Sequence, residues 1–229
     1  MKTPPLLESL RGRLIVSCQA VAPSPLRRSD IIAALAECAA IGGAAGLRID
    51  SPEDVAATRA RVRVPIVGLF KRRAGSPLYI TPAFEDAQAI ARAGAEIVAV
   101  QATRERARHG DPLPQLIARL HAECGVLVMA DVSTADEGAT AEAAGADVVA
   151  TTMAGYTPHS RQMPGPDLRL VEELAARVSV PVVAEGRIQT PEDAAAARRA
   201  GAWAVVVGRA ITMPDAITAR FVRAVEEAI

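Results

Sequence analysis

Two charged residues stand at the ends of apolar runs, where a buried strand would deliver them to the surface. Lys71 closes the run VRVPIVGLFK and Glu185 closes VPVVAE. Burial and neighbouring cations lower the pKa of a lysine, which leaves some neutral amine to act as a base at neutral pH. A carboxylate after an apolar run is costly unless it is paired or useful. We therefore predict a base at Lys71 and a proton donor or acceptor at Glu185.

Both residues also have a structural interpretation. Lys71 could be a solvated charge at the end of its strand, and the adjacent Arg72 and Arg73 fit surface positions or the steering of anions. Glu185 could form a structural ion pair with Arg187 or Arg48. Strongly perturbed titratable groups occur in ion-pair networks as well as in active sites, so both interpretations stay open here.

Three more polar residues follow apolar runs. Arg48, after GGAAGL, suits an anion or a carbonyl oxygen, or a structural salt bridge. Asp131, after VLVMA, is either a helix-capping carboxylate or an acceptor that orients Lys71 or a substrate hydroxyl. Gln19 ends LIVSCQ and could bond a ligand or simply line the site.

Two glycine-containing loops, EGRIQTPED and VGRAITMPD, favour a phosphate site. Gly186 and Gly208 permit close backbone approach, and the helices expected to follow present free N–H groups. Phosphate binding after strands seven and eight recurs in α/β barrels. Glycine turns also occur without phosphate, so this signal is not decisive alone.

The elements that must position these residues are eight short apolar runs separated by alanine-rich segments. Continuous apolar character is typical of parallel strands covered on both faces. The predicted strands are Leu14–Gln19, Ala45–Ile49, Pro65–Lys71, Ile97–Ala102, Val126–Val132, Asp147–Thr152, Pro181–Gly186 and Ala204–Gly208.

The connecting segments contain signals for the starts of helices, and some of their sequence patterns are repeated along the chain. Ser51 and Thr190 each precede Pro-Glu-Asp, as an N-cap does, and Thr134 with Glu137 can form a capping box. One pattern, in which a helix ends on Gly and a strand then begins, recurs in AGAEIVAV, AGADVVATT and AGAWAVVVG. We predict a (β/α)8 barrel over residues 1–229 as a single domain, with an extra helix in PPLLESLRG that closes its bottom.

Composition excludes several classes of protein. Lys+Arg and Asp+Glu both number 26 and only 3% of residues are aromatic, which argues against nucleic-acid binding. We expect no signal peptide, because Glu8, Arg11 and Arg13 interrupt any apolar region near the N-terminus. No apolar run reaches membrane length, and three scattered cysteines fit a reducing cytoplasm. The three histidines show no ligand spacing and no GxGxxG follows the first strand, so we expect no metal and no nicotinamide.

The strand-end motifs together resemble the bacterial N-acetylmannosamine-6-phosphate 2-epimerase family. They are LIVSCQA, GGAAGLRI, PIVGLFKR, YITPAFED, MADVSTADEG, TTMAGYTPHS, VPVVAEGRIQTPED and AITMPD, in order over nearly the whole chain. The resemblance implies a cofactor-independent TIM barrel, usually a homodimer, in sialic acid catabolism. Such an enzyme interconverts N-acetylmannosamine 6-phosphate and N-acetylglucosamine 6-phosphate.

Carried over by motif, the resemblance implies catalytic roles for Lys71 and Glu185. It implies ligand-orienting roles for Gln19, Arg48 and Asp131. The other matches are Gly186, Arg187 and Gly208 on the phosphate side, with Tyr79, Thr152 and Tyr156 near the mouth.

Three positions depart from the family pattern. Gln101 stands where we expect Asp in a DAT motif, Arg209 where we expect a second glycine, and Met213 where we expect Arg before the proline. Arg209 either supplies the phosphate charge lost at Met213 or crowds the phosphate. We assign Arg209 to phosphate binding; the departures bear on phosphate geometry and substrate choice.

Two alternative functions remain at this level. A Schiff-base aldolase would also place a lysine such as Lys71 at a barrel strand end, and borohydride trapping with substrate would detect its imine. A non-catalytic barrel that binds sugar phosphate would bind without turnover. A metal-dependent epimerase is disfavoured because the His/Asp ligand set is missing from the sequence.

Overall fold

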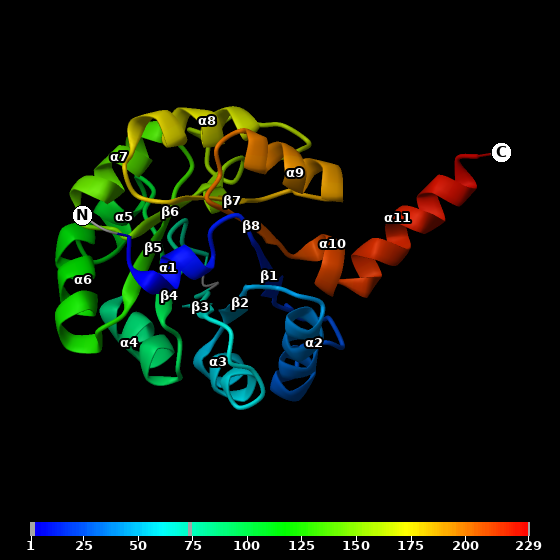
Figure 1. The fold of residues 1–229 in the computed structure, drawn as a ribbon, viewed down its shortest axis with the longest axis horizontal. Coiled ribbons are helices and arrows are strands. Elements are labelled where there is room, and N and C mark those ends of the chain that lie inside the picture. The colour runs from blue at the N-terminus through cyan, green and yellow to red at the C-terminus, as the bar shows by residue number, and fades with distance from the viewer. Residues whose placement is uncertain (1–2, 73–74, 229) are drawn as a thin grey trace.

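The computed structural model describes residues 3–72 and 75–228, in which eight parallel strands close into a barrel (Figure 1). Each strand pairs with the next in the sequence, and β1 pairs with β8. The strands are β1 (Leu14–Cys18), β2 (Gly46–Asp50), β3 (Ile66–Leu69), β4 (Ile97–Gln101), β5 (Leu127–Asp131), β6 (Val148–Ala150), β7 (Val182–Glu185) and β8 (Ala204–Val207). The predicted (β/α)8 architecture is confirmed.

The described helices lie around the barrel in Figure 1, except that the first crosses its end and the last extends away from it. They are α1 (Pro5–Ser9), α2 (Ser29–Ile41), α3 (Pro52–Arg59), α4 (Phe84–Arg92), α5 (Arg106–His109), α6 (Leu113–Arg119), α7 (Ala135–Ala143), α8 (Leu168–Arg177), α9 (Pro191–Arg199), α10 (Arg209–Thr212) and α11 (Pro214–Glu226). A π-helical turn, η1 (Leu120–Cys124), extends α6, and a 3-10 turn, η2 (Thr151–Met153), follows β6. None of these described helices is long and apolar enough to cross a membrane.

The strands are buried on both faces, which explains their unbroken apolar character. Val16 and Leu47 belong to the larger core cluster, which includes residues of the surrounding helices. Ile15 and Val67 belong to a second cluster formed mainly by strand residues. Successive side chains along a strand point to opposite faces, so both faces need apolar residues.

The N-terminal helix α1 closes the bottom of the barrel, as predicted. Its Leu7 is 2% exposed and joins the second core cluster with Ile15 and Ile97. The indole of Trp203 donates a hydrogen bond to the carbonyl oxygen of Leu7 at 2.9 Å. This end of the barrel is therefore packed shut, and the opposite end is left for ligands.

The predicted helix starts are also confirmed. Ser51 caps α3 by accepting from the amide of Asp54 at 3.2 Å. Thr134 with Glu137 and Thr190 with Asp193 form reciprocal capping boxes at α7 and α9. These caps fix the directions in which three helices leave the mouth of the barrel.

Two strand boundaries differ from the prediction in ways that matter for the site. Strand β3 ends at Leu69, and Lys71 pairs instead with Ile80 in an isolated antiparallel bridge. Strand β2 continues to Asp50, so Arg48 is its middle residue and not its last. Ile49 packs in the larger cluster, and alternation then directs Arg48 into the barrel interior.

Candidate active site

A cavity of 510 Å³ opens at the carboxyl ends of the strands. Its walls come from six of the eight strands or their following loops, so residues far apart in sequence meet there. The lining side chains include Ser17, Gln19, Arg48, Lys71, Tyr79, Thr152, Tyr156, Glu185, Arg187, Gln189, Arg209 and Met213, together with Gly186 and Gly208.

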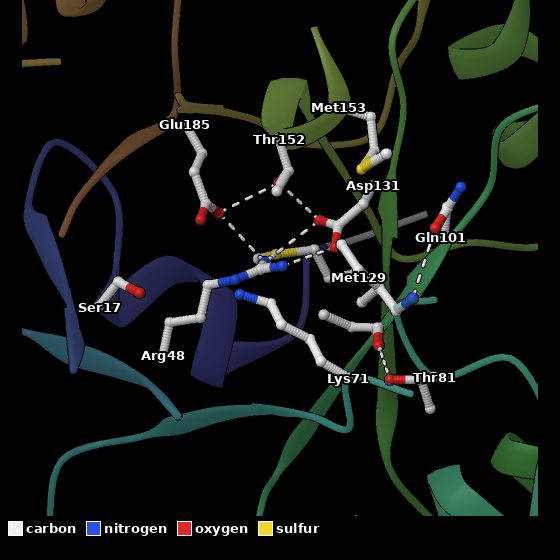
Figure 2. Close-up of polar contacts among 12 residues, drawn as sticks. Ser17, Arg48, Lys71, Thr81, Gln101, Met129, Asp131, Thr152, Met153 and Glu185 are labelled. Carbon is white, nitrogen blue, oxygen red and sulfur yellow. Dashed lines mark hydrogen bonds and ion pairs between the residues drawn. The ribbon is translucent and has the colours of Figure 1, made fainter. Parts of the chain in front are cut away.

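Arg48 is the centre of a buried ionic network (Figure 2). Its side chain is 1% exposed and forms two hydrogen bonds to Asp131, at 2.5 and 3.1 Å. Its Nη1 also lies 3.1 Å from Oε2 of Glu185. Thr152 donates to Asp131 at 2.7 Å and lies 3.1 Å from Glu185. One guanidinium and one hydroxyl therefore orient both carboxylates.

Burial sets the protonation of this network. Burial raises the pKa of Glu185, and the nearby carboxylate of Asp131 adds to that shift, while Arg48, Thr152 and Lys71 oppose it. Burial alone would lower the pKa of Arg48, but Asp131 and Glu185 raise it above its ordinary value. Arg48 is therefore a permanent cation, whereas Glu185 can hold a proton more readily than an exposed glutamate.

Lys71 approaches the network from the β3 side of the barrel. Its main-chain amide donates to Oδ1 of Asp50 at 2.9 Å, and its Nζ donates to Oε1 of Gln19. The Gln19 amide nitrogen in turn donates to Ser17 Oγ at 2.9 Å. Figure 2 shows the Lys71 amine directed toward the same centre as Arg48 and Glu185. An amine and a carboxylate thus face one cavity.

The side of the cavity formed by the β7 and β8 loops is more open. Gly186 has a φ of 113°, a conformation that favours glycine, and the loop continues through Arg187. Arg187 Nε donates to the carbonyl oxygen of Gly165 at 2.9 Å, and its guanidinium lies 5.5 Å from the centre of the Tyr156 ring. Arg209 begins α10 at the exposed rim.

None of the three histidines lines this cavity. His121 Nε2 is 2.8 Å from Asp147, and His159 Nε2 is 3.9 Å from Glu105. Within residues 3–72 and 75–228, no three His, Cys, Asp or Glu side chains are grouped as a metal ion would require.

A family model described as "Putative N-acetylmannosamine-6-phosphate epimerase" matches residues 32–227. The chain belongs to this epimerase family. A relative named "Putative N-acetylmannosamine-6-phosphate 2-epimerase" from Caldanaerobacter subterraneus subsp. tengcongensis is 45% identical over 224 residues, covering 97% of this chain and 94% of that protein. A relative of the same name from Thermosynechococcus vestitus is 47% identical over 222 residues, covering 96% of each.

The fold of the epimerase family is also seen in a solved structure. The structure of the N-acetylmannosamine-6-phosphate 2-epimerase from Clostridium perfringens superposes with a TM-score of 0.92 at 40% identity, covering 97% of both chains. Thiamine phosphate pyrophosphorylase from Pyrococcus furiosus, 19% identical with a TM-score of 0.61, shares the fold alone.

The structure brings together the residues singled out from the epimerase-family motifs, with one difference of placement. Asp131 does not line the cavity; it lies behind Arg48 and is 0% exposed. It caps no helix, because Thr134 caps α7, and its contacts are with Arg48 and Thr152. Glu185 does form an ion pair with Arg48, the structural alternative considered from sequence, yet it still faces the cavity. Arg73 lies outside the described residues.

Sequence reasoning overlooked two supporting residues and one compositional signal. Ser17 and Asp50 position Gln19 and Lys71, although nothing in their local sequence marks them. The signal is that Lys2 and Lys71 are the only lysines among 26 basic residues. Arginine cannot act as a base because it stays protonated, so a lysine kept in an arginine-rich chain points to amine chemistry.

Proposed function

We propose that this protein is a cofactor-independent epimerase that interconverts N-acetylmannosamine 6-phosphate and N-acetylglucosamine 6-phosphate. The observation that carries the proposal is the convergence of Lys71 and Glu185 on one cavity, with the buried Arg48 contacting Glu185. Family membership supports the choice of substrate. In sialic acid catabolism, the enzyme would link the two amino-sugar phosphates.

The chemistry requires removal of the proton at C2. In the open-chain sugar this carbon is next to the C1 aldehyde, so breaking the C–H bond leaves an enolate. Lys71 takes the C2 proton as the neutral amine or returns it as the ammonium, and Glu185 serves the opposite transfer or hydrogen-bonds the reacting oxygens. The raised pKa of Glu185 suits a carboxyl that donates a proton.

Arg48 supplies the positive charge that the enolate needs. Its guanidinium is held by Asp131 and Glu185, so it is already oriented before the substrate binds. Its Nε is buried and has no hydrogen-bond partner among the described residues. Gln19, Thr152, Tyr79 and Tyr156 line the cavity. We assign Gln19 and Thr152 to orienting the sugar hydroxyl and acetamido groups, with Tyr79 and Tyr156 at the mouth.

The phosphate is assigned to the loops after β7 and β8. Gly186 and Gly208 allow the backbone to approach, and Arg187 and Arg209 supply positive charge on that side. A phosphate held there orients C2 toward Lys71 and converts binding energy into alignment of the reacting atoms.

Phosphorus NMR would test the proposed conversion directly. Purified protein is incubated with N-acetylmannosamine 6-phosphate, and the signal of N-acetylglucosamine 6-phosphate is expected to appear until equilibrium. Glucosamine 6-phosphate is the control for the acetamido group. Unphosphorylated N-acetylmannosamine, followed by proton NMR because it contains no phosphorus, is the control for the phosphate. Binding without conversion would make the protein a sugar-phosphate-binding barrel. A borohydride-trapped imine on Lys71 would indicate aldolase-type chemistry instead.

The remaining expectations concern assembly and location. We expect a cytoplasmic homodimer whose residues 1–229 form one domain, and the closed ring of strands supports the domain assignment. Helix α11 extends away from the barrel in Figure 1, and its Phe221 and Val225 are each 70% exposed. A second copy of the chain that covers this apolar face would explain why these two side chains are exposed in a single copy. Light scattering should give a dimer mass, and Phe221→Asp should shift it toward the monomer; a monomeric wild type would contradict the expectation.

A further inference from the structure

Strand β4 ends in Gln101, the residue that stands where the family pattern has Asp. Its side chain is 0% exposed and does not line the cavity. We propose that Gln101 is a positioning residue that holds Lys71 and Tyr79 at the mouth by anchoring the segment 77–81. The proposal rests on the proposed function, in which Lys71 is the base.

Gln101 contacts this segment at three successive peptide units. Its Oε1 accepts from the amides of Tyr79 at 3.0 Å and Ile80 at 3.4 Å, and its Nε2 donates to the carbonyl oxygen of Pro77 at 2.9 Å. Its main-chain amide also donates to the Ile80 carbonyl oxygen at 3.0 Å. Nε2 donates again to Thr103 Oγ1 at 2.9 Å, so both ends of the side chain are occupied.

The anchored segment in turn holds the chain around Lys71. The amide of Arg72 donates to the Tyr79 carbonyl oxygen at 2.8 Å, and the amide of Thr81 donates to the Phe70 carbonyl oxygen at 2.8 Å. These bonds flank the bridge between Lys71 and Ile80. Because β3 ends at Leu69, this short ladder and the Asp50 contact replace the barrel sheet as the support of Lys71. Figure 2 draws Gln101 and Thr81 with their contacts in this region.

The chemistry of the contacts requires an amide. The segment presents N–H donors to Oε1 and a carbonyl acceptor to Nε2. A carboxylate could accept from the N–H groups, but it could not donate to Pro77, and its charge would repel that carbonyl oxygen. Gln101→Glu therefore removes the donor while keeping shape and acceptor, and a buried acceptor left unpaired is costly.

Gln101→Glu should lower kcat for epimerisation roughly 10- to 100-fold, because a displacement near 1 Å of a reacting group has effects of that size. KM should change by no more than about threefold, because the loops after β7 and β8, to which the phosphate is assigned, are unchanged in this variant. Gln101→Met, which removes donor and acceptor together, should have at least the same effect. The matched control is Glu137→Gln, which makes the opposite change, from carboxylate to amide, at another buried side chain that binds loop backbone. Glu137 accepts hydrogen bonds from the main-chain amides of Ser133, Thr134 and Arg104. It should leave kcat and KM within about twofold.

Hydrogen exchange gives a readout independent of catalysis. Faster exchange at the amides of Arg72, Tyr79 and Thr81 in Gln101→Glu, and not in Glu137→Gln, is expected together with the fall in kcat. Unchanged exchange would overturn the anchoring, and faster exchange with wild-type kcat would overturn its consequence for Lys71. If the wild type itself fails to epimerise, the proposed function fails. The rate of Lys71 acylation in a Lys2→Arg background then decides whether Gln101 sets the position of the amine.

Discussion

The centre of the cavity and its phosphate side are built from similar charges in different settings. At the centre, Arg48 is 1% exposed, and each carboxylate it contacts also contacts Thr152. On the phosphate side, Arg209 is exposed at the start of a four-residue helix, and Arg187 is held by one hydrogen bond to a backbone carbonyl. Buried charges must be paired, whereas exposed charges are screened by water.

This difference explains where the chain can depart from its family's pattern. A change at Arg48, Asp131 or Glu185 would leave a buried charge without its partner. Arg209 and Met213 both line the cavity. We propose that they can replace the glycine and arginine expected there, because a cation can reach a phosphate from more than one backbone position. We therefore expect residues at the centre to determine the chemistry and residues at the rim to determine the affinity for the phosphate.

The largest effect is expected from Lys71→Arg, which keeps a positive charge at the centre but removes the ability to lose a proton. General-base contributions are typically 10²–10⁴-fold, and kcat should fall by roughly that factor. Calorimetric titration should still detect sugar-phosphate binding, since the phosphate loops are unchanged. Turnover near the wild-type rate would remove Lys71 from the role of base.

Asp131→Ala should lower the free energy of unfolding by about 3–5 kcal/mol, because it leaves the buried Arg48 with one carboxylate partner fewer. Urea unfolding monitored by circular dichroism measures the change. Asp30→Ala, which breaks the exposed pair with Arg28 2.9 Å away, is the control and should leave the unfolding midpoint unchanged. Equal effects of the two variants would contradict the distinction between buried and exposed pairs.

A smaller effect is expected at the rim. Arg209→Ala should raise KM for the phosphorylated sugar about tenfold at low salt and less at high salt, with kcat nearly unchanged. Adding Met213→Arg to this variant should recover part of the loss by returning the cation to the position expected from the family pattern. If Arg209→Ala instead lowered KM, Arg209 would be crowding the phosphate.

The smallest expected effect is on thermal stability as a function of pH. Because burial raises the pKa of Glu185 above 4.5, the folded state favours its protonated form. That stability is present below pH 4.5 and is lost as pH rises through the higher folded-state pKa. Glu185→Gln removes this loss, so the difference between its Tm and that of the wild type should shift in favour of the variant as pH rises above 4.5. A Tm difference that is constant with pH would contradict the raised pKa.

The contrast between centre and rim also explains what sequence could predict. Apolar runs located the strands, and the residues at their ends located Lys71, Asp131 and Glu185, because parallel strands bring their carboxyl ends together. Periodicity could not show that β3 stops before Lys71, since the bridge depends on Ile80, in the segment between β3 and α4, pairing back with Lys71. Nor could it show that Asp131 lies behind Arg48, because side-chain direction depends on register within the closed barrel.

The central claim, that Lys71 exchanges the proton at C2, is tested most directly in D₂O. Proton NMR would follow N-acetylmannosamine 6-phosphate with the wild type and with Lys71→Arg, each first shown to be folded. The account predicts that the wild type forms the N-acetylglucosamine epimer with deuterium at C2, while Lys71→Arg leaves both configuration and C2 proton unchanged. Deuterium incorporation by Lys71→Arg at the wild-type rate, or an epimer that fully retains its C2 proton, would contradict it.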